Sequence, residues 1–144
     1  MILRKDGRNW FSNFIPFETP VVYQGISYPT PEHFYQAMKA NRDDLAARRS
    51  VAAAGTPGQA KRAGRAVALR SDWNTVKVDV MRYALEKKFA PGTSQRMLLD
   101  NTTEPIVEWN SWHDNYWGYC TCPRCAKKQH LNMLGKLLME IRDA

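Results

Sequence analysis

The sequence has little cysteine and no long apolar run. Only three of its 144 residues are cysteines, and they lie together at Cys120, Cys122 and Cys125. An odd number of cysteines crowded into one stretch argues against a disulfide framework and fits a reducing compartment. No apolar run approaches the roughly 20 residues that span a bilayer, and the first residues lack the apolar core of a secretory signal. We therefore expect a soluble, cytoplasmic protein without a membrane partner.

Several familiar catalytic motifs are also missing. The sequence contains no G-x-x-x-x-G-K-[ST], no G-x-G-x-x-G after a strand, no H-E-x-x-H and no G-x-S-x-G. Nucleoside triphosphate hydrolysis, dinucleotide-dependent redox chemistry and serine hydrolysis therefore lose their usual sequence support.

Acidic residues are absent from one long stretch of a basic chain. The chain carries 21 Lys and Arg against 14 Asp and Glu, a formal net charge of +7, and residues 45–71 contain no acid. Such a stretch attracts phosphate groups, although many basic proteins bind no nucleic acid. The partner it favours is a nucleic acid or a phosphorylated small molecule. Its basic residues are Arg48, Arg49, Lys61, Arg62, Arg65 and Arg70.

The length and the pattern predict a single α+β domain over residues 1–144, mainly α-helical, with a small β-hairpin and short strands. Hydrophobic residues make up 44% and aromatic residues 11% of the chain, which is ordinary for a globular protein. Because the strands are segregated from the helices, an α+β arrangement is favoured over an alternating α/β one. We expect strands over 21–23, 26–28 and 105–109, and helices over about 31–50, 56–69, 71–90 and through 134–141.

The first predicted helix carries a polar stripe. At about 100° per residue, Glu32, Gln36, Lys39 and Asp43 fall on one side of it. Such a stripe is most often the solvated face of a surface helix. The position of Glu32 in the first turn, near the predicted hairpin, leaves a second interpretation open, namely the wall of a cleft.

A loop of three aromatic residues follows the predicted strand at 105–109. It runs from Trp112 to Gly118 and also contains Asp114 and Asn115. Aromatic faces can stack on bases, and the polar residues between them can read sugar hydroxyls or base edges. An irregular loop folded over the core by its own aromatic residues explains the pattern equally well.

The three cysteines and His130 form a candidate metal site. Three thiolates and one imidazole complete a tetrahedral zinc shell, and a closed shell of protein ligands makes such a zinc structural. The C-x-C-x-x-C spacing followed by His130 is not a common zinc-ribbon pattern. A cluster of reduced thiols is therefore the alternative, and a redox role is less favoured than either.

Several motifs together resemble those of the NADAR, or YbiA-like, family, in the family's order from about residue 9 to residue 142. They are Phe11-Ser12-Asn13-Phe14, residues 28–39, Asp72-Trp73 with Val80-Met81, Tyr116-Trp117-Gly118 and residues 132–139. The resemblance implies a compact, mainly helical α+β domain that cleaves the C1′–N bond of a ribosylated substrate with water. Two substrate classes are associated with the family, namely ADP-ribose attached to guanine in nucleic acid and early phosphorylated riboflavin intermediates.

The resemblance also implies roles for individual residues. Glu32 and Lys39 match the family's catalytic helix. A carboxylate can stabilise an oxocarbenium-like state and manage the proton of the attacking water. Lys39 could hold a phosphate, protonate the leaving group or attack C1′ as a Schiff-base nucleophile. The implied substrate-binding residues are Phe11, Ser12, Asn13, Gln36, Trp73, Asp114, Trp117, Gly118 and Asn132.

From these observations we expect an N-glycosidase that removes ADP-ribose from guanine in nucleic acid and needs no cofactor for catalysis. The alternatives are hydrolysis of phosphorylated riboflavin intermediates, a non-catalytic module that binds ADP-ribose or nucleic acid, and a small zinc-containing nucleic-acid module built on the cysteine stretch. The segment with the three cysteines departs from the family pattern, because many shorter relatives carry a glycine-rich loop there.

Overall fold

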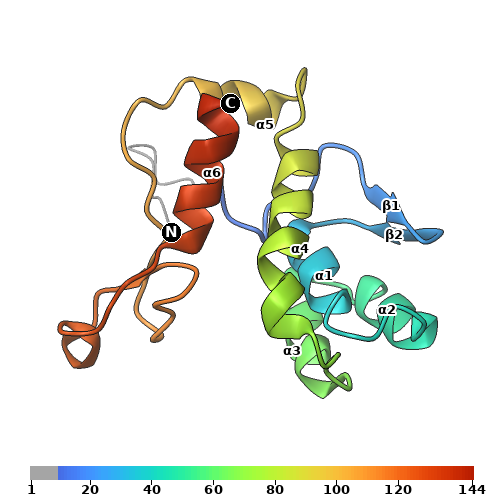
Figure 1. The fold of residues 1–144 in the computed structure, drawn as a ribbon. Helices are drawn as coiled ribbons and strands as arrows, with labels where there is room; N and C mark the ends of the chain where they lie inside the picture. Colours follow the sequence, from blue (N-terminus) through green and yellow to red (C-terminus); the bar gives the residue numbers. More distant parts are fainter. Residues whose placement is uncertain (1–9) are drawn as a thin grey trace. The chain divides into compact units, whose positions relative to one another are not determined.

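The computed structural model describes residues 10–144, which form two compact units (Figure 1). The helical unit comprises Asn13–Lys88. The C-terminal unit comprises Phe89–Ala144 together with the described residues up to Ser12. The α+β class with a helical majority is confirmed, while a single domain over the whole chain stays a prediction.

The helical unit begins with a β-hairpin. Strands β1 (Val21–Tyr23) and β2 (Ile26–Tyr28) pair antiparallel, with Val22 opposite Ser27. The two residues between them, Gln24 and Gly25, have φ angles of 53° and 74°. A two-residue turn with both φ angles positive matches the twist of the strands, which explains the glycine. The hairpin prediction is confirmed.

Four helices complete the helical unit, and α1 is central to it. Helix α1 contacts each of the other three helices. Threonines cap α1 and α3: Thr30 accepts a hydrogen bond from the amide of His33, and Thr56 accepts one from Gln59, both at 3.1 Å. A proline follows each cap at the first helical position, where its missing N–H costs nothing. The helices are α1 (Pro31–Ala37), α2 (Leu45–Ala52), α3 (Pro57–Ala66) and α4 (Trp73–Lys88).

The prediction of one helix over residues 31–50 is wrong, because α1 ends at Ala37 and α2 begins at Leu45. The carbonyl of Lys39 accepts the amide of Arg70 at 2.8 Å, and the carbonyl of Ala40 accepts Arg48 Nη2 at 3.1 Å. Both carbonyls thus bind groups from outside α1. Asp44 then caps α2 by accepting the amide of Ala47 at 3.1 Å, as short acidic side chains do at a new helix start.

The C-terminal unit has two α-helices, α5 (Ser94–Asp100) and α6 (Met133–Asp143), and between them two short strands and a 3₁₀ turn (Pro123–Cys125). Strands β3 (Trp109–Asn110) and β4 (Tyr119–Cys120) pair in parallel. The strand predicted at 105–109 is thus confirmed only at its last residue. The sequence analysis missed α5, whose seven residues are too few for a clear periodic pattern.

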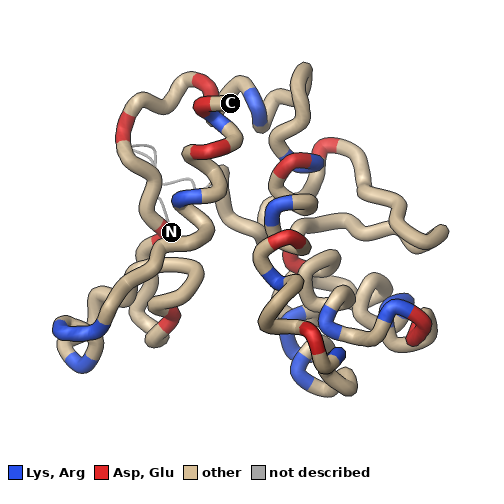
Figure 2. Tube along the Cα trace, in the orientation of Figure 1, with Lys and Arg blue, Asp and Glu red and all other residues tan. Residues whose placement is uncertain are grey.

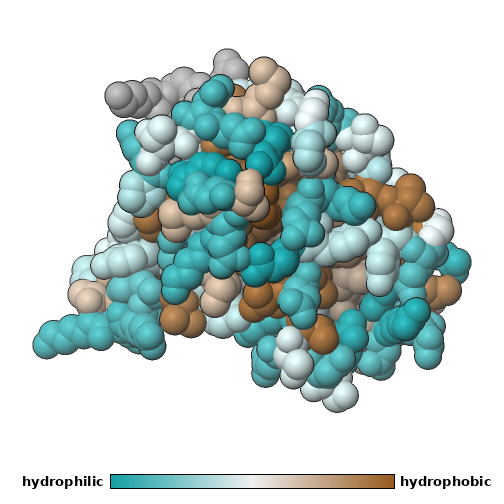
Figure 3. Space-filling view, turned by 45° about the horizontal axis from the view of Figure 1, so that its top comes forward, coloured by the Kyte–Doolittle hydropathy of each residue, from teal (hydrophilic) through white to brown (hydrophobic). Residues whose placement is uncertain are grey.

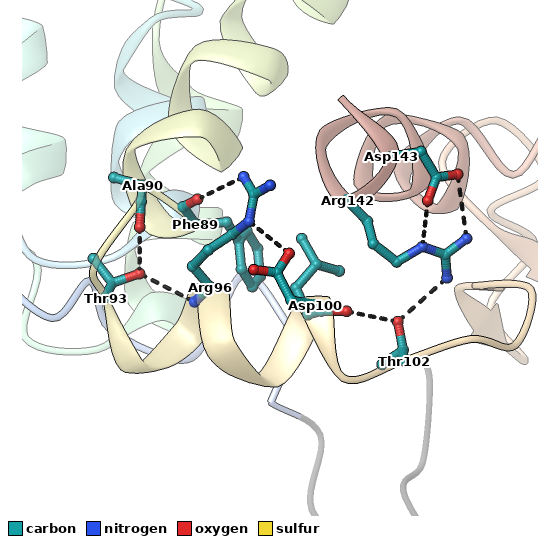
Figure 4. A network of polar contacts seen from close by, with 9 residues as sticks. Phe89, Ala90, Thr93, Arg96, Asp100, Thr102, Arg142 and Asp143 are labelled. Atoms are coloured by element: carbon teal, nitrogen blue, oxygen red, sulfur yellow. Dashed lines mark hydrogen bonds and ion pairs between the residues drawn. The ribbon is translucent and has the colours of Figure 1, made fainter.

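Polar contacts hold the ends of α5 and α6 (Figure 4). Thr93 caps α5 by accepting the amide of Arg96 at 3.0 Å, and Arg96 pairs with Asp100 one turn later at 2.7 Å. Near the end of α6, Arg142 donates to Thr102 Oγ1 at 3.3 Å and to the carbonyl of Glu104 at 2.9 Å. Arg142 therefore ties α6 to the segment that follows α5.

Apolar side chains form the interior of each unit. In the helical unit, the Phe34 ring stacks on Tyr83 and meets the edges of Tyr23 and Tyr28, with ring centroids 5.3 to 5.6 Å apart. Hydrophilic residues cover most of the face drawn in Figure 3, where hydrophobic residues show in separate patches. Within residues 10–144, no helix is both long and apolar enough to span a bilayer.

Candidate functional site

Two of the four residues of the predicted polar stripe are buried in α1, whereas Lys39 and Asp43 lie beyond its end and Asp43 is exposed. Glu32 is 8% exposed and Gln36 is 4% exposed. The Gln36 amide nitrogen donates to Glu32 Oε1 at 2.7 Å, one helical turn along. The solvated-face interpretation is therefore excluded for these two residues. A buried carboxylate needs such a donor, because burial without a partner costs several kcal/mol.

Two buried acceptors, one in this pair and one on Asn13, have no hydrogen-bond partner among the described residues. One is Gln36 Oε1, which points away from the carboxylate because Nε2 is the donor to Glu32, and the other is Asn13 Oδ1. Asn13 lies beside the start of α1, since its carbonyl accepts the amide of Glu32 at 3.1 Å. Buried polar atoms normally have partners, so these two acceptors are candidates for a hydrogen bond from a bound water or ligand.

Gly64 lets α3 approach this face of α1. A Cβ at Gly64 would lie 2.1 Å from Gln36 Oε1 and 2.8 Å from Gln36 Cβ. Real side chains do not tolerate such distances, so glycine at position 64 is what allows Gln36 its place beside Glu32. The sequence analysis missed this residue, because a glycine inside a helix gives no sign of what it faces.

Burial shifts the two proposed catalytic groups toward their neutral forms. It raises the pKa of Glu32, against the hydrogen bond from Gln36 and the positive charges of Lys61 and Lys39. It lowers the pKa of Lys39, against the charge of Glu32 and with the added repulsion of Arg65 and Lys61. Opposed shifts of this kind are typical of acid–base pairs at active sites.

The ring of Tyr35 lies near Lys39 and contacts a second aromatic ring. Its ammonium nitrogen lies 5.6 Å from the centroid of the Tyr35 ring, and Tyr35 meets the edge of Trp73 with centroids 5.1 Å apart. Trp73 is buried at the start of α4. Lys39 itself is half-buried. Of the predicted site residues, Asn13, Glu32, Gln36, Lys39 and Trp73 thus belong to the helical unit.

His33 has a structural role. Its Nε2 lies 2.8 Å from the carbonyl of Ala54, and its Nδ1 lies 2.8 Å from Thr30 Oγ1. A carbonyl can only accept, so Nε2 carries a proton. With both ring nitrogens engaged inside the helical unit, the ring fixes the start of α1.

The remaining predicted residues lie in the C-terminal unit, where Asp114 organises a turn. Asp114 Oδ1 accepts the amides of Tyr116 at 3.2 Å and Trp117 at 2.9 Å. Asn110 secures the same loop: its Oδ1 accepts the amides of Trp112 and Asp114, and its Nδ2 donates to the Asp114 carbonyl at 2.7 Å. The sequence analysis did not single out Asn110.

Gly118 and Asn132 are tightly engaged in the C-terminal unit. A Cβ at Gly118 would lie 2.2 Å from the carbonyl of Glu108. Asn132 Nδ2 donates to the carbonyl of Ile106 at 2.8 Å, and its Oδ1 accepts the amide of Glu108 at 2.9 Å. These contacts fasten the start of α6, and a role of Asn132 in substrate binding stays a prediction.

The other three predicted residues of this unit are aromatic or small. Phe11 meets the edge of Phe89 with centroids 5.8 Å apart, and Ser12 is buried. Trp117 is half-buried and meets the edge of the Tyr116 ring at 5.0 Å. Their contacts with substrate also stay predictions.

The cysteine cluster is completed by His113 and not by His130. The ligand atoms of His113, Cys120, Cys122 and Cys125 all lie within 4.8 Å of one another. The ring of His130 is engaged elsewhere: its Nδ1 lies 2.6 Å from Asn115 Oδ1, and it stacks on Tyr119 with centroids 3.6 Å apart. The prediction of His130 as the fourth ligand is corrected accordingly. His113 was missed because it precedes the cysteines.

Not all arginines of the acid-free stretch lie on the surface. Arg48 is 1% exposed and donates to Gln24 Oε1 at 2.6 Å, and the half-buried Arg70 pairs with Asp72 through Nε and Nη2. Both line a cavity of about 380 Å³ that also contacts Phe34, whereas Glu32 and Lys39 do not line it. The basic residues left on α2 and α3, visible as blue segments in Figure 2, are Arg49, Lys61, Arg62 and Arg65.

Comparison with known proteins identifies the family. Residues 3–144 match the NADAR domain. The chain is 39% identical to N-glycosidase Npun_R5314 of Nostoc punctiforme, over 92% of this chain and 83% of the relative. It is 36% identical to N-glycosidase YbiA of Escherichia coli, over 92% and 79%. The NMR structure of E. coli YbiA matches with a TM-score of 0.73, covering 93% of this chain and 76% of that one.

A further relative is a longer protein. The chain is 33% identical to the chloroplastic riboflavin biosynthesis protein PYRR of Zea mays, over 92% of this chain but 23% of that protein. Taken together, these matches place the chain in the NADAR domain family, and the fold is that of YbiA.

Proposed function

We propose that this protein is an N-glycosidase that uses Glu32 and Lys39 to hydrolyse the C1′–N bond of a ribosylated substrate. It is a hydrolase acting on N-glycosyl bonds, like the relatives that carry the name N-glycosidase. The observation that supports the assignment of residues is the buried Glu32–Gln36 pair, in which a hydrogen bond of 2.7 Å fixes the orientation of the carboxylate.

In the proposed reaction, Glu32 stabilises the positive charge that develops at C1′ and accepts a proton from the attacking water. The water oxygen bonds to C1′ as the C1′–N bond breaks, and the electron pair of that bond goes to the leaving nitrogen. Lys39 donates the proton that this nitrogen needs, which its lowered pKa makes easier. Glu32 then releases its proton to water and Lys39 takes one up from water, so both groups return to their starting states and the cycle closes without a cofactor.

The substrate that we favour is ADP-ribose attached to guanine in nucleic acid. The exposed basic residues of α2 and α3 support this choice, because a polymer can contact them while one nucleotide is at the site. The riboflavin-pathway name of the maize relative favours a second candidate, a phosphorylated ribosyl intermediate. Phosphate groups are present in both, so the basic surface attracts either one.

The test is a mass-spectrometric time course on a guanine-ADP-ribosylated oligonucleotide, with Glu32→Gln as the matched control. The expected result is release of ADP-ribose and restored guanine by the wild type, and a loss of at least about a hundredfold in the variant. Near-normal turnover by Glu32→Gln would refute the role of the carboxylate. Inactivity of the folded wild type on the oligonucleotide, together with turnover of a phosphorylated riboflavin intermediate, would select the second substrate.

The role of Lys39 is tested by borohydride reduction during turnover. A general acid forms no covalent bond with C1′, so Lys39 is expected to remain unlabelled. A ribosyl adduct on Lys39 would instead establish a Schiff-base mechanism. Binding of ADP-ribose without any product, by a protein shown to be folded, would make the chain a binding module.

We also propose that any metal in this protein is structural. The cluster of one histidine and three cysteines could hold a metal, and its four protein ligands would leave no open position for a substrate or a reacting water.

A further inference from the structure

We propose that His113, Cys120, Cys122 and Cys125 bind one zinc ion that fixes the loop of residues 110–125. Three separate segments supply these ligands. His113 comes from the loop after β3, Cys120 from the end of β4, Cys122 from the position just before the 3₁₀ turn and Cys125 from the end of that turn. The inference about the loop's purpose rests on the proposed function, whereas the metal site itself does not.

The distances fit a tetrahedral ion. His113 Nδ1 lies 3.2 Å from Cys122 Sγ, 3.3 Å from Cys125 Sγ and 4.0 Å from Cys120 Sγ. Zinc bonds of about 2.0 Å to nitrogen and 2.3 Å to sulfur place the two atoms roughly 3.5 Å apart at a tetrahedral angle. The three observed separations lie on both sides of that value.

Hydrogen bonding alone does not explain this convergence. Nδ1 has one position for a hydrogen bond, so it either donates its proton to one sulfur or accepts the proton of one thiol. Three sulfurs nevertheless surround it, and all three cysteines are free of disulfides. A cation bound between the four atoms accounts for all the contacts at once. Soft thiolates and imidazole select zinc over magnesium or calcium.

The backbone around His113 is shaped to present the ring. His113 has a φ of 70°, a left-handed conformation that costs a non-glycine residue free energy. Asn110 holds the two neighbouring amides, those of Trp112 and Asp114. The amide of His113 itself donates to Cys120 Sγ at 3.3 Å, a contact that stabilises a metal-bound thiolate.

Charge around the cluster is also suitable. Three thiolates and one zinc ion leave a net charge of −1. Basic residues lie within or just after the 3₁₀ turn and can balance this charge. Figure 2 shows them as blue segments in the loop before α6. These residues are Arg124, Lys127 and Lys128.

The cluster encloses much of the loop that carries the predicted substrate-binding residues. Asp114, Trp117 and Gly118 all lie between His113 and Cys120 in the sequence. A metal that binds both His113 and Cys120 reduces the number of conformations that the residues between them can adopt. Zinc therefore orders the substrate loop without taking part in the reaction.

Elemental analysis of the reduced full-length protein, purified without chelators, is the first test. We expect one zinc per chain. We also expect that replacing the zinc with Co²⁺ gives thiolate charge-transfer absorption and tetrahedral d–d bands, a readout independent of activity. Zinc-free protein with three titratable thiols, and no Co²⁺ spectrum, would overturn the proposal whether or not the protein is a glycosidase.

Two histidine variants form a matched pair. His113→Gln is expected to weaken zinc binding at least about tenfold, whereas His130→Gln should retain one zinc per chain. Retention by His113→Gln and loss by His130→Gln would overturn the ligand assignment. If His113→Gln fails to fold, release of zinc from the wild type by a thiol-modifying reagent still tests the cysteine ligands: one zinc released per three thiols modified supports them, and no release refutes them.

Discussion

Replacing Gly64 with alanine tests the packing that holds the proposed catalytic face of α1. The new Cβ would lie 2.1 Å from Gln36 Oε1, 2.8 Å from its Cβ and 2.9 Å from its Cδ. The Gln36 side chain must therefore move, and its hydrogen bond to Glu32 is lost. A hydrogen bond to a charged group contributes about 1.5–3 kcal/mol, and overpacking adds about 1–3 kcal/mol.

Better helix propensity offsets part of this cost. Alanine stabilises a helix interior by roughly 0.5–1 kcal/mol relative to glycine. The expected net loss in the free energy of unfolding is therefore about 1.5–5.5 kcal/mol, measured by urea denaturation. Activity should fall by about tenfold or more. A displaced Glu32 carboxylate that stabilises the transition state by about 1.4 kcal/mol less would lower the rate by a factor of ten.

Gly58 provides a control in the same helix. A Cβ there would lie 3.9 Å from Thr56 Oγ1, an ordinary contact. The free energy of unfolding of Gly58→Ala is therefore expected to lie within about 1 kcal/mol of the wild-type value. Its activity is expected to be normal. Equal stability and equal activity of Gly64→Ala and Gly58→Ala would refute the close approach of α3 to Gln36.

Other predictions concern pH, a helix cap and an asparagine. The pH profile of kcat/KM should have an acid limb above the usual glutamate pKa and an alkaline limb below the usual lysine pKa, from the opposed shifts of Glu32 and Lys39; limbs at ordinary values would count against both roles. Because burial raises the pKa of Glu32 in the folded state, the stability of the wild type should decline as pH rises through that raised pKa. The melting temperature of Glu32→Gln at neutral pH should therefore be no lower than that of the wild type. Thr56→Ala should lower the unfolding free energy by about 1 kcal/mol through loss of the α3 cap. Asn132→Ala should cost about 2–3 kcal/mol in urea, from two lost hydrogen bonds, and a smaller loss would mean that they are weak.

Local signals in the sequence predicted the elements that depend on local chemistry. The hairpin follows from Gln24 and Gly25, and the starts of α1 and α3 follow from a threonine and a proline in succession. The break between α1 and α2 could not be predicted in this way. The groups that bind the carbonyls of Lys39 and Ala40 are Arg70 and Arg48, which are distant along the chain or belong to the next helix.

At the candidate site, too, local signals predicted one part of the arrangement and contacts between distant residues decided the other. Helical spacing placed Glu32 and Gln36 on one face, but spacing cannot distinguish a solvated face from a buried one. What decides between them is Gly64 of α3, which brings a second helix against that face. The residue that allows the stripe to be buried thus lies 28 residues from Gln36 and has no side chain that a motif could record.

His113 and His130 illustrate why the order of residues in a motif is a weak guide to ligation. Both histidines lie within a dozen residues of a cysteine, so proximity in sequence does not separate them. The choice depends on backbone geometry: a left-handed residue at 113 directs its ring toward the cysteines, while Asn115 and Tyr119 engage the ring of His130. Asn110 secures the amides on either side of His113. Replacing Asn110 should therefore weaken metal binding although it is not a ligand, which Co²⁺ titration of Asn110→Ala would measure; unchanged affinity would show that the three thiolates alone position the histidine.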